Sequence, residues 1–149
     1  MDTQQHGGPV EILLVEDRMG DVRLTLEALK EIQVPHNLNV IGDGDRVLPY
    51  LRRETPYEDS LRPDLILLDL NLPTTDGREV LRAIKGDPAL RTIPVIILTT
   101  SSSPKDIQMT YDLQANCYVT KPADLDQFLS VVKSLETFWL SIVKLPSRI

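Results

Sequence analysis

The feature that most restricts the fold is a short apolar segment that ends in an acid. Residues 63–69 read P-D-L-I-L-L-D, so four aliphatic side chains precede Asp69. A continuous run of this length, bounded by Pro and Asp, is typical of a strand buried on both faces of a parallel sheet. Turn-forming residues follow at 71–77. The sequence therefore predicts an acid held at the end of a core strand, beside a loop.

The rest of the chain alternates strand-like and helix-like patterns. We expect strands at 10–15, 37–41, 65–68, 95–98 and 117–119, and helices at 21–33, 47–51, 78–85, 104–113 and 124–143. Helices that connect successive strands require parallel pairing and cover the sheet. The predicted fold class is α/β: a flavodoxin-like (βα)5, doubly wound, parallel five-stranded sheet of order 2-1-3-4-5, with an extended C-terminal helix.

Length and composition exclude several classes of protein. The 149 residues predict one domain over 10–149, preceded by a disordered tail at 1–9 that does not resemble a signal peptide. The net charge of -6 argues against a nucleic-acid partner, because phosphate recognition needs a basic face. One cysteine, Cys117, allows neither an internal disulfide nor a zinc cluster. Without an apolar segment of membrane-spanning length, we expect a cytoplasmic protein with no membrane partner.

Chemically active side chains follow four of the five predicted strands. Glu16 and Asp17 end the first strand, Asp69 the third, Thr99 the fourth and Lys121 the fifth. In an open parallel sheet these ends lie along one edge, where ligands bind at the point at which the strand order reverses. We therefore expect the five side chains to converge.

Such a group of side chains describes a phosphoryl site. Two carboxylates about 4 Å apart repel by about 4 kcal/mol at an effective dielectric constant near 20, so three acids need a divalent cation or a proton. A ligand set of oxygens alone favours Mg²⁺. Lys121 and Thr99 suit the oxygens of a phosphate. Taken singly, the acids could cap a helix, Thr99 could be an ordinary strand-end hydroxyl, and Lys121 a solvated lysine.

Four segments of the sequence resemble the receiver domain of two-component response regulators. They are L-L-V-E-D, L-I-L-L-D-L-N-L-P-T-T-D-G, P-V-I-I-L-T-T and Y-V-T-K-P, and together they span nearly the whole chain. The resemblance implies that Asp69 accepts a phosphoryl group from a histidine kinase in a phosphorelay. It also implies that the protein is not an enzyme beyond Mg²⁺-dependent self-phosphorylation from phosphohistidine and slow autodephosphorylation.

The resemblance also assigns roles to individual residues. Glu16, Asp17, Asp69 and the backbone carbonyl of Asn71 would bind Mg²⁺. Thr99 and Lys121 would contact the phosphoryl group, and Thr99 with Tyr118 would form the conformational switch. Glu16 is one methylene longer than the more usual Asp, so we expect it to be a weaker ligand than Asp17.

Two further segments narrow the resemblance. They are similar to stand-alone receivers that serve phytochrome-type histidine kinases, which implies light signalling, and they read L-D-L-N-L-P-x-x-D-G-R-E-V-L and S-L-E-T-F-W-L.

The main alternative is a receiver-like interaction module that is not phosphorylated. A haloacid-dehalogenase-type phosphatase would carry its nucleophile on the first strand with a second Asp. A flavodoxin would carry a Ser/Thr/Gly phosphate loop there, where this chain has E-D-R-M-G.

The predicted last helix has more apolar positions than one buried face needs. A stripe that could cover the sheet comprises Leu125, Phe128, Leu129, Val132, Leu135, Trp139, Ile142 and Val143. Val131, Phe138 and Leu145 lie on an adjoining stripe. We expect a homodimer through the fourth helix, fifth strand and fifth helix, with Trp139 joining this stripe at the interface, because aromatic residues anchor interfaces. The alternative is that both aromatic side chains fold back over their own core. By resemblance, the first helix docks the kinase.

Overall fold

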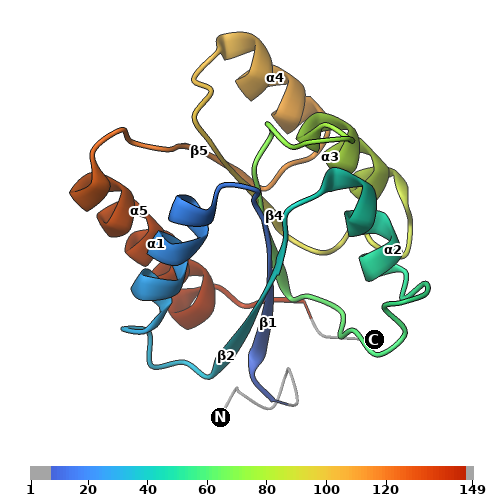
Figure 1. The fold of residues 1–149 in the computed structure, drawn as a ribbon, viewed down its shortest axis with the longest axis horizontal. Coiled ribbons are helices and arrows are strands. Elements are labelled where there is room, and N and C mark those ends of the chain that lie inside the picture. The colour runs from blue at the N-terminus through green and yellow to red at the C-terminus, as the bar shows by residue number, and fades with distance from the viewer. Residues whose placement is uncertain (1–7, 147–149) are drawn as a thin grey trace.

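The computed structural model describes residues 8–146, and within them five parallel strands form one sheet (Figure 1). The strands are β1 (Val10–Val15), β2 (His36–Ile41), β3 (Leu65–Leu68), β4 (Val95–Thr99) and β5 (Cys117–Thr120), in the order β2-β1-β3-β4-β5. This confirms the predicted fold class and strand order. Most of the predicted tail at 1–9 lies outside the described residues, and the domain boundaries stay a prediction.

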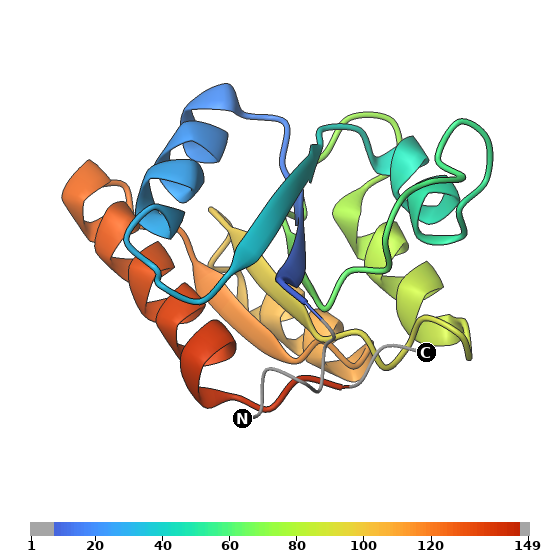
Figure 2. The same cartoon turned by 90° about the horizontal axis from the view of Figure 1, so that it is seen from below.

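Helices cover both faces of the sheet. They are α1 (Met19–Leu29), α2 (Val47–Leu51) after a 3-10 turn η2 (Gly44–Arg46), α3 (Gly77–Gly86), α4 (Pro104–Asp112) and α5 (Leu125–Thr137), which continues as the π-helical turn η3 (Phe138–Ile142). Figures 1 and 2 show α1 and α5 side by side on one face, with α2 and α3 on the other. Among residues 8–146, no helix is long and apolar enough to span a membrane.

The central strands are apolar throughout because both of their faces are covered. In β3, Ile66 and Leu68 belong to the core beneath α2 and α3, whereas Leu65 and Leu67 belong to the core beneath α1 and α5. All four side chains are fully buried. Because successive side chains of a strand point to opposite faces of the sheet, this continuous apolar run contributes to both cores, as predicted for a parallel sheet.

Acids and hydroxyls fix where the helices begin. Asp76 caps α3, Ser103 caps α4 with Pro104 at the first helical position, and Asp124 caps α5. These caps lie on the same edge of the sheet as the strand ends, because each of these helices follows a strand. The predicted first helix is wrong in its bounds: it begins two residues earlier and ends four residues earlier than expected.

The extended C-terminal helix is confirmed over α5 and η3, but several of its side chains lie elsewhere than predicted. Helical structure ends at Ile142, and Val143 is extended, with φ -75° and ψ 142°. Leu145 then turns back into the core beside Leu140 and is only 5% exposed, so its predicted place in a dimer surface is wrong. Leu125 and Ile142, predicted to cover the sheet, are instead 68% and 65% exposed. The wider π-turn after Thr137 changes the side of the helix that Ile142 occupies, which the spacing of apolar residues could not reveal.

Candidate functional site

The carboxyl ends of β1, β3, β4 and β5 bring the predicted site residues together. The Asp69 amide donates to the Val15 carbonyl at 3.0 Å, which ties the residue after β3 to the end of β1. Four of the side chains are buried: Glu16 is 3% exposed, Asp69 4%, Thr99 0% and Lys121 6%. Asp17 lies at the same edge but is exposed.

Backbone packing fixes the loop that carries Asp69. The Gly77 amide donates to the Leu70 carbonyl at 2.8 Å. A Cβ atom at position 77 would lie 2.2 Å from the Asp69 carbonyl oxygen, which no side chain allows. Gly77 therefore permits α3 to begin directly against the backbone of the candidate phosphoacceptor.

The Lys121 ammonium group lies among three carboxylates. Its Nζ atom is 2.5 Å from Glu16 Oε1, 2.7 Å from Asp21 Oδ2 and 3.2 Å from Asp69 Oδ2. Burial alone lowers the pKa of Lys121, but the hydrogen bonds to Asp21 and Glu16 outweigh it and the pKa is raised. The side chain is therefore a fixed positive charge beside Asp69, not a solvated lysine.

Glu16, Asp17 and Asp69 form an acidic cluster that fits a divalent cation. One carboxylate oxygen from each lies within 4.8 Å of those of the other two. Burial raises the pKa of Glu16 to about 7, although Lys121 acts in the opposite direction. Glu16 also accepts the Arg18 amide at 3.2 Å. A hard cation held by oxygens would relieve the repulsion among these acids.

The remaining predicted residues surround this cluster. The Asn71 amide donates to Asp69 Oδ1 at 3.2 Å, while its role as a carbonyl ligand stays a prediction. The Thr99 hydroxyl is fully buried and has no hydrogen-bond partner among residues 8–146. The Tyr118 hydroxyl donates to the Ser101 carbonyl at 2.8 Å, in the loop between β4 and α4. The loop after Thr99 is thus already bonded to the predicted switch aromatic.

Sequence reasoning missed two parts of the site. Asp21, in the first turn of α1, is absent from the predicted site residues, although it lies four positions after Asp17. The ion pair between Arg78 and Asp106, which joins α3 to α4 at 2.7 Å, was also missed. Nothing in either residue's local sequence indicates its partner, because the two residues are 28 positions apart.

Comparison with known proteins assigns the family. Residues 12–133 match the response regulator receiver domain. This chain therefore belongs to the receiver family of response regulators, as its sequence segments indicated. The match covers β2 to β5 completely, β1 from its third residue and most of α5, so it includes every residue of the acidic cluster.

Individual relatives are similar over most of their length. Response regulator Rcp1 of Synechocystis sp. is 48% identical over 139 residues, which are 93% of this chain and 95% of Rcp1. The structure of the phosphorylated cyanobacterial phytochrome response regulator RcpA superposes with a TM-score of 0.91 at 52% identity, covering 93% of this chain and 99% of that one. The Mn²⁺-bound form of Rcp1 gives a TM-score of 0.92 at 47% identity, with 93% and 100% covered.

Proposed function

We propose that this chain is a response regulator in which Asp69 accepts a phosphoryl group from a phosphohistidine of a histidine kinase. One observation carries the proposal. Asp69 is buried at the end of a core strand, with the Lys121 ammonium 3.2 Å from its carboxylate and the Glu16 and Asp17 oxygens within 4.8 Å. A purely structural acid would not need both a buried cation and two further acids.

The transfer is a displacement at phosphorus. A carboxylate oxygen of Asp69 forms the new P–O bond while the P–N bond to the donor histidine breaks, and the imidazole nitrogen leaves with the electron pair. Lys121 neutralises charge on the non-bridging oxygens, and the Thr99 hydroxyl donates to one of them. Attack by water on the same phosphorus later returns the Asp69 carboxylate and inorganic phosphate.

Mg²⁺ is the proposed cofactor. Glu16, Asp17, Asp69 and the backbone carbonyl of Asn71 would hold it, and the Mn²⁺-bound form of the relative Rcp1 supports a divalent cation in this fold. When bound, the ion offsets negative charge as the phosphoryl group arrives. The proposed ion would share with Lys121 the task of offsetting the charges of Glu16 and Asp69, whose carboxylates lie 2.5 Å and 3.2 Å from the Nζ atom of Lys121.

The conformational response is proposed to pass through Thr99 and Tyr118. The buried Thr99 hydroxyl lacks a partner among the described residues, so a phosphoryl oxygen would supply one. Movement of Thr99 would carry with it the adjoining loop, whose Ser101 carbonyl accepts the Tyr118 hydroxyl. Phosphorylation would thereby favour one of two arrangements that the chain already has.

The proposed partner is a phytochrome-type histidine kinase. Its support is the similarity to RcpA, a cyanobacterial phytochrome response regulator, over 93% of this chain. We propose docking through α1, cytoplasmic signalling by a single receiver domain at 10–149, and no binding to nucleic acid. The acidic net charge of -6 agrees with the last point.

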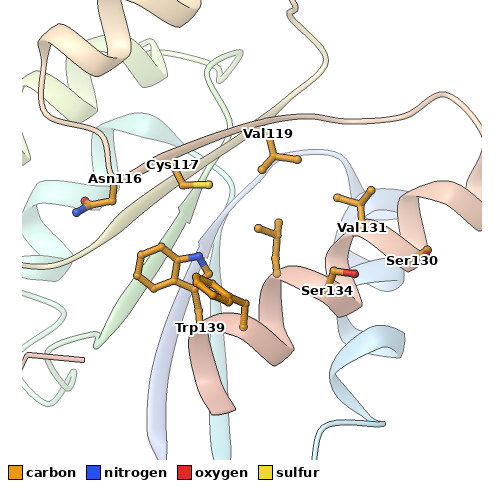
Figure 3. A pocket seen from close by; sticks show the side chains of 9 residues that line it. Asn116, Cys117, Val119, Ser130, Val131, Ser134 and Trp139 are labelled. Carbon is orange, nitrogen blue, oxygen red and sulfur yellow. The ribbon is translucent and has the colours of Figure 1, made fainter. Parts of the chain in front are cut away.

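A homodimer through α4, β5 and α5 is also proposed. Figure 3 shows Trp139 beneath β5, on the side of Cys117. Both residues line an open groove of about 430 Å³ between β5 and α5. Phe138 lies at the same groove, 49% exposed, with its ring edge-to-face against Trp139 at 5.9 Å. Val131 is half-buried on the α5 side. An exposed aromatic side chain beside an apolar groove is typical of an interface anchor.

Mass spectrometry after incubation with Mg²⁺ and acetyl phosphate tests the phosphoacceptor. We expect the wild type to gain the mass of one phosphoryl group, and Asp69→Asn to gain none. Asp126→Asn, an exposed acid in the first turn of α5, is the matched control and should be labelled like the wild type. Absence of labelling in the wild type, with Mg²⁺ present, would favour the unphosphorylated interaction module.

A further inference from the structure

A group of polar side chains joins the beginnings of α3 and α4. Arg78 lies in the first turn of α3, and its guanidinium group binds both carboxylate oxygens of Asp106, from Nε at 2.9 Å and from Nη2 at 2.7 Å. Its Nη1 atom binds Asp76, the cap of α3, at 2.8 Å. The Arg78 side chain is 22% exposed and that of Asp106 is 14% exposed.

This position is electrostatically unusual for an arginine. The beginning of a helix favours negative charge, so a cation in the first turn of α3 needs compensation. Two carboxylates supply it, and the paired geometry to Asp106 is specific to a guanidinium group. The hydrogen bonds from Arg78 and Ser101 lower the pKa of Asp106 to about 2. The pair is therefore a defined contact between two helices rather than a solvated surface pair.

The contact extends to the predicted switch residue. The Ser101 hydroxyl donates to Asp106 Oδ2 at 2.6 Å. The Ser101 carbonyl accepts the Tyr118 hydroxyl at 2.8 Å. Hydrogen bonds thus join Arg78 of α3 to Asp106 and Asp106 to the Ser101 hydroxyl, and the backbone carbonyl of the same Ser101 joins the Tyr118 hydroxyl on β5.

We propose that Arg78 and Asp106 are positioning residues of the switch, holding the Ser101 carbonyl where it receives the Tyr118 hydroxyl. This inference rests on the proposed phosphoryl switch at Asp69. The β4–α4 loop follows Thr99 directly, so it must respond to a phosphoryl group while remaining bonded to Tyr118. The Arg78–Asp106 pair fixes the far end of that loop. Because the α4 end of the loop is held in place, a displacement of Thr99 cannot be absorbed by moving the whole loop. The displacement instead changes the position of the Ser101 carbonyl, to which the Tyr118 hydroxyl is bonded.

Nuclear magnetic resonance of ¹³C-labelled tyrosine tests this directly. The chain has four tyrosines, and Tyr50 and Tyr57, whose rings pack edge-to-face at 5.5 Å, are the internal references. Tyr118→Phe assigns the signal. The variants are Arg78→Gln, Arg78→Lys, which keeps the charge but not the paired geometry, and Asp106→Asn. Arg82→Gln is the matched control, since Arg82 lies on the same helix and forms an exposed ion pair with Glu79 at 3.6 Å.

In the unphosphorylated protein, Arg78→Gln should shift the Tyr118 signal toward that of free tyrosine, with Tyr50 and Tyr57 unchanged. The Tyr118 signal of Arg78→Lys should be close to that of Arg78→Gln and not to that of the wild type. The double variant Arg78→Gln with Asp106→Asn should shift the Tyr118 signal no more than the single variant with the larger shift. After acetyl phosphate, Arg78→Gln should be labelled like the wild type but lose most of the phosphorylation-dependent Tyr118 shift.

A Tyr118 signal in Arg78→Gln equal to that in Arg82→Gln would overturn the proposal, as would full rescue by Arg78→Lys or additive shifts in the double variant. These comparisons use the unphosphorylated protein. A wild type that gains no phosphoryl mass would instead contradict the proposed function, while the resting Tyr118 comparison would still decide the positioning role.

Discussion

The carboxylate of Asp21 lies 2.7 Å from the Lys121 ammonium, although 100 residues separate them in the sequence. This contact joins the first turn of α1 to the end of β5, across the acidic cluster. Glu16 and Asp69 compete for the same ammonium group. By attracting the Lys121 ammonium group, Asp21 weakens the interaction of this group with the two candidate metal ligands, Glu16 and Asp69.

Asp21→Asn should weaken Mg²⁺ binding. Without the Asp21 charge, Lys121 is attracted more strongly to Glu16 and Asp69, where it opposes a cation, and the site also loses one negative charge. We expect a loss of about 1 kcal/mol, or roughly fivefold in affinity. An Mg²⁺ titration by calorimetry measures it. Glu27→Gln, an exposed acid of α1 that forms an ion pair with Lys30, is the control and should bind like the wild type. Tighter binding by Asp21→Asn would contradict this account.

Asp17 and Glu16 should differ as metal ligands. Glu16 is buried and already bonded to Lys121 at 2.5 Å and to the Arg18 amide, whereas Asp17 is exposed. Asp17→Ala should weaken Mg²⁺ binding by at least about tenfold, the usual scale for a lost ligand or its support. Glu16→Gln should cost less. Equal losses in parallel titrations would contradict the ranking.

Removing the Thr99 hydroxyl should stabilise the resting protein while impairing the switch. Thr99→Val keeps the side-chain shape but removes a buried donor that lacks a partner among the described residues. A buried unsatisfied group costs about 1 kcal/mol or more, so the melting temperature should rise by about 2–4 °C. The phosphorylation-dependent shift of Tyr118 should be lost. Calorimetry and tyrosine resonances check the two effects separately, and a lower melting temperature would show that the hydroxyl is satisfied in solution.

The sequence predicted those parts of the site that depend on strand order. Once the strands are parallel and ordered 2-1-3-4-5, Asp69, Thr99 and Lys121 must share one edge, whatever their exact contacts. Contacts between helices were not predictable in this way. Asp21 reaches Lys121, and Arg78 reaches Asp106, only through the packing of neighbouring elements. Leu145 was misplaced for a similar reason, since the helix ends at Ile142 and the extended chain after it returns Leu145 to the core.

A buried acid in α5 should make stability depend on pH. Glu136 is 1% exposed, neither carboxylate oxygen has a hydrogen-bond partner among residues 8–146, and burial raises its pKa from 4.5 to about 8. The unfolded chain releases this proton near pH 4.5, but the folded chain retains it to about pH 8. The folded state thus binds more protons between these values, and stability falls as pH rises through that window.

Glu136→Met should remove this dependence and stabilise the protein most at pH 8. Methionine fills a similar volume without a charge to desolvate. Each unit of pKa displacement corresponds to about 1.4 kcal/mol, so an effect of a few kcal/mol is expected near pH 8 and little near pH 5. Urea unfolding at a series of pH values measures it, with Glu27→Met as an exposed control. A constant difference between Glu136→Met and wild type at every pH would reject the titration of Glu136.

Phe138 offers the sharpest test of the proposed dimer. Ending the chain at Ser134 would also remove Leu140 and Leu145, which are buried at 8% and 5% exposure, so loss of association would be confounded with loss of folding. Phe138→Ser avoids this because the ring is 49% exposed. If Phe138 anchors the interface, its removal should weaken self-association by about tenfold or more, the effect of losing a contact worth above 1.4 kcal/mol.

Ile142→Ser, 65% exposed about one turn later, is the matched control and should associate like the wild type. Light scattering over a range of concentrations, with and without acetyl phosphate, gives the dissociation constants. A monomeric wild type under both conditions would reject the dimer, and equal weakening by both variants would reject Phe138 as its anchor.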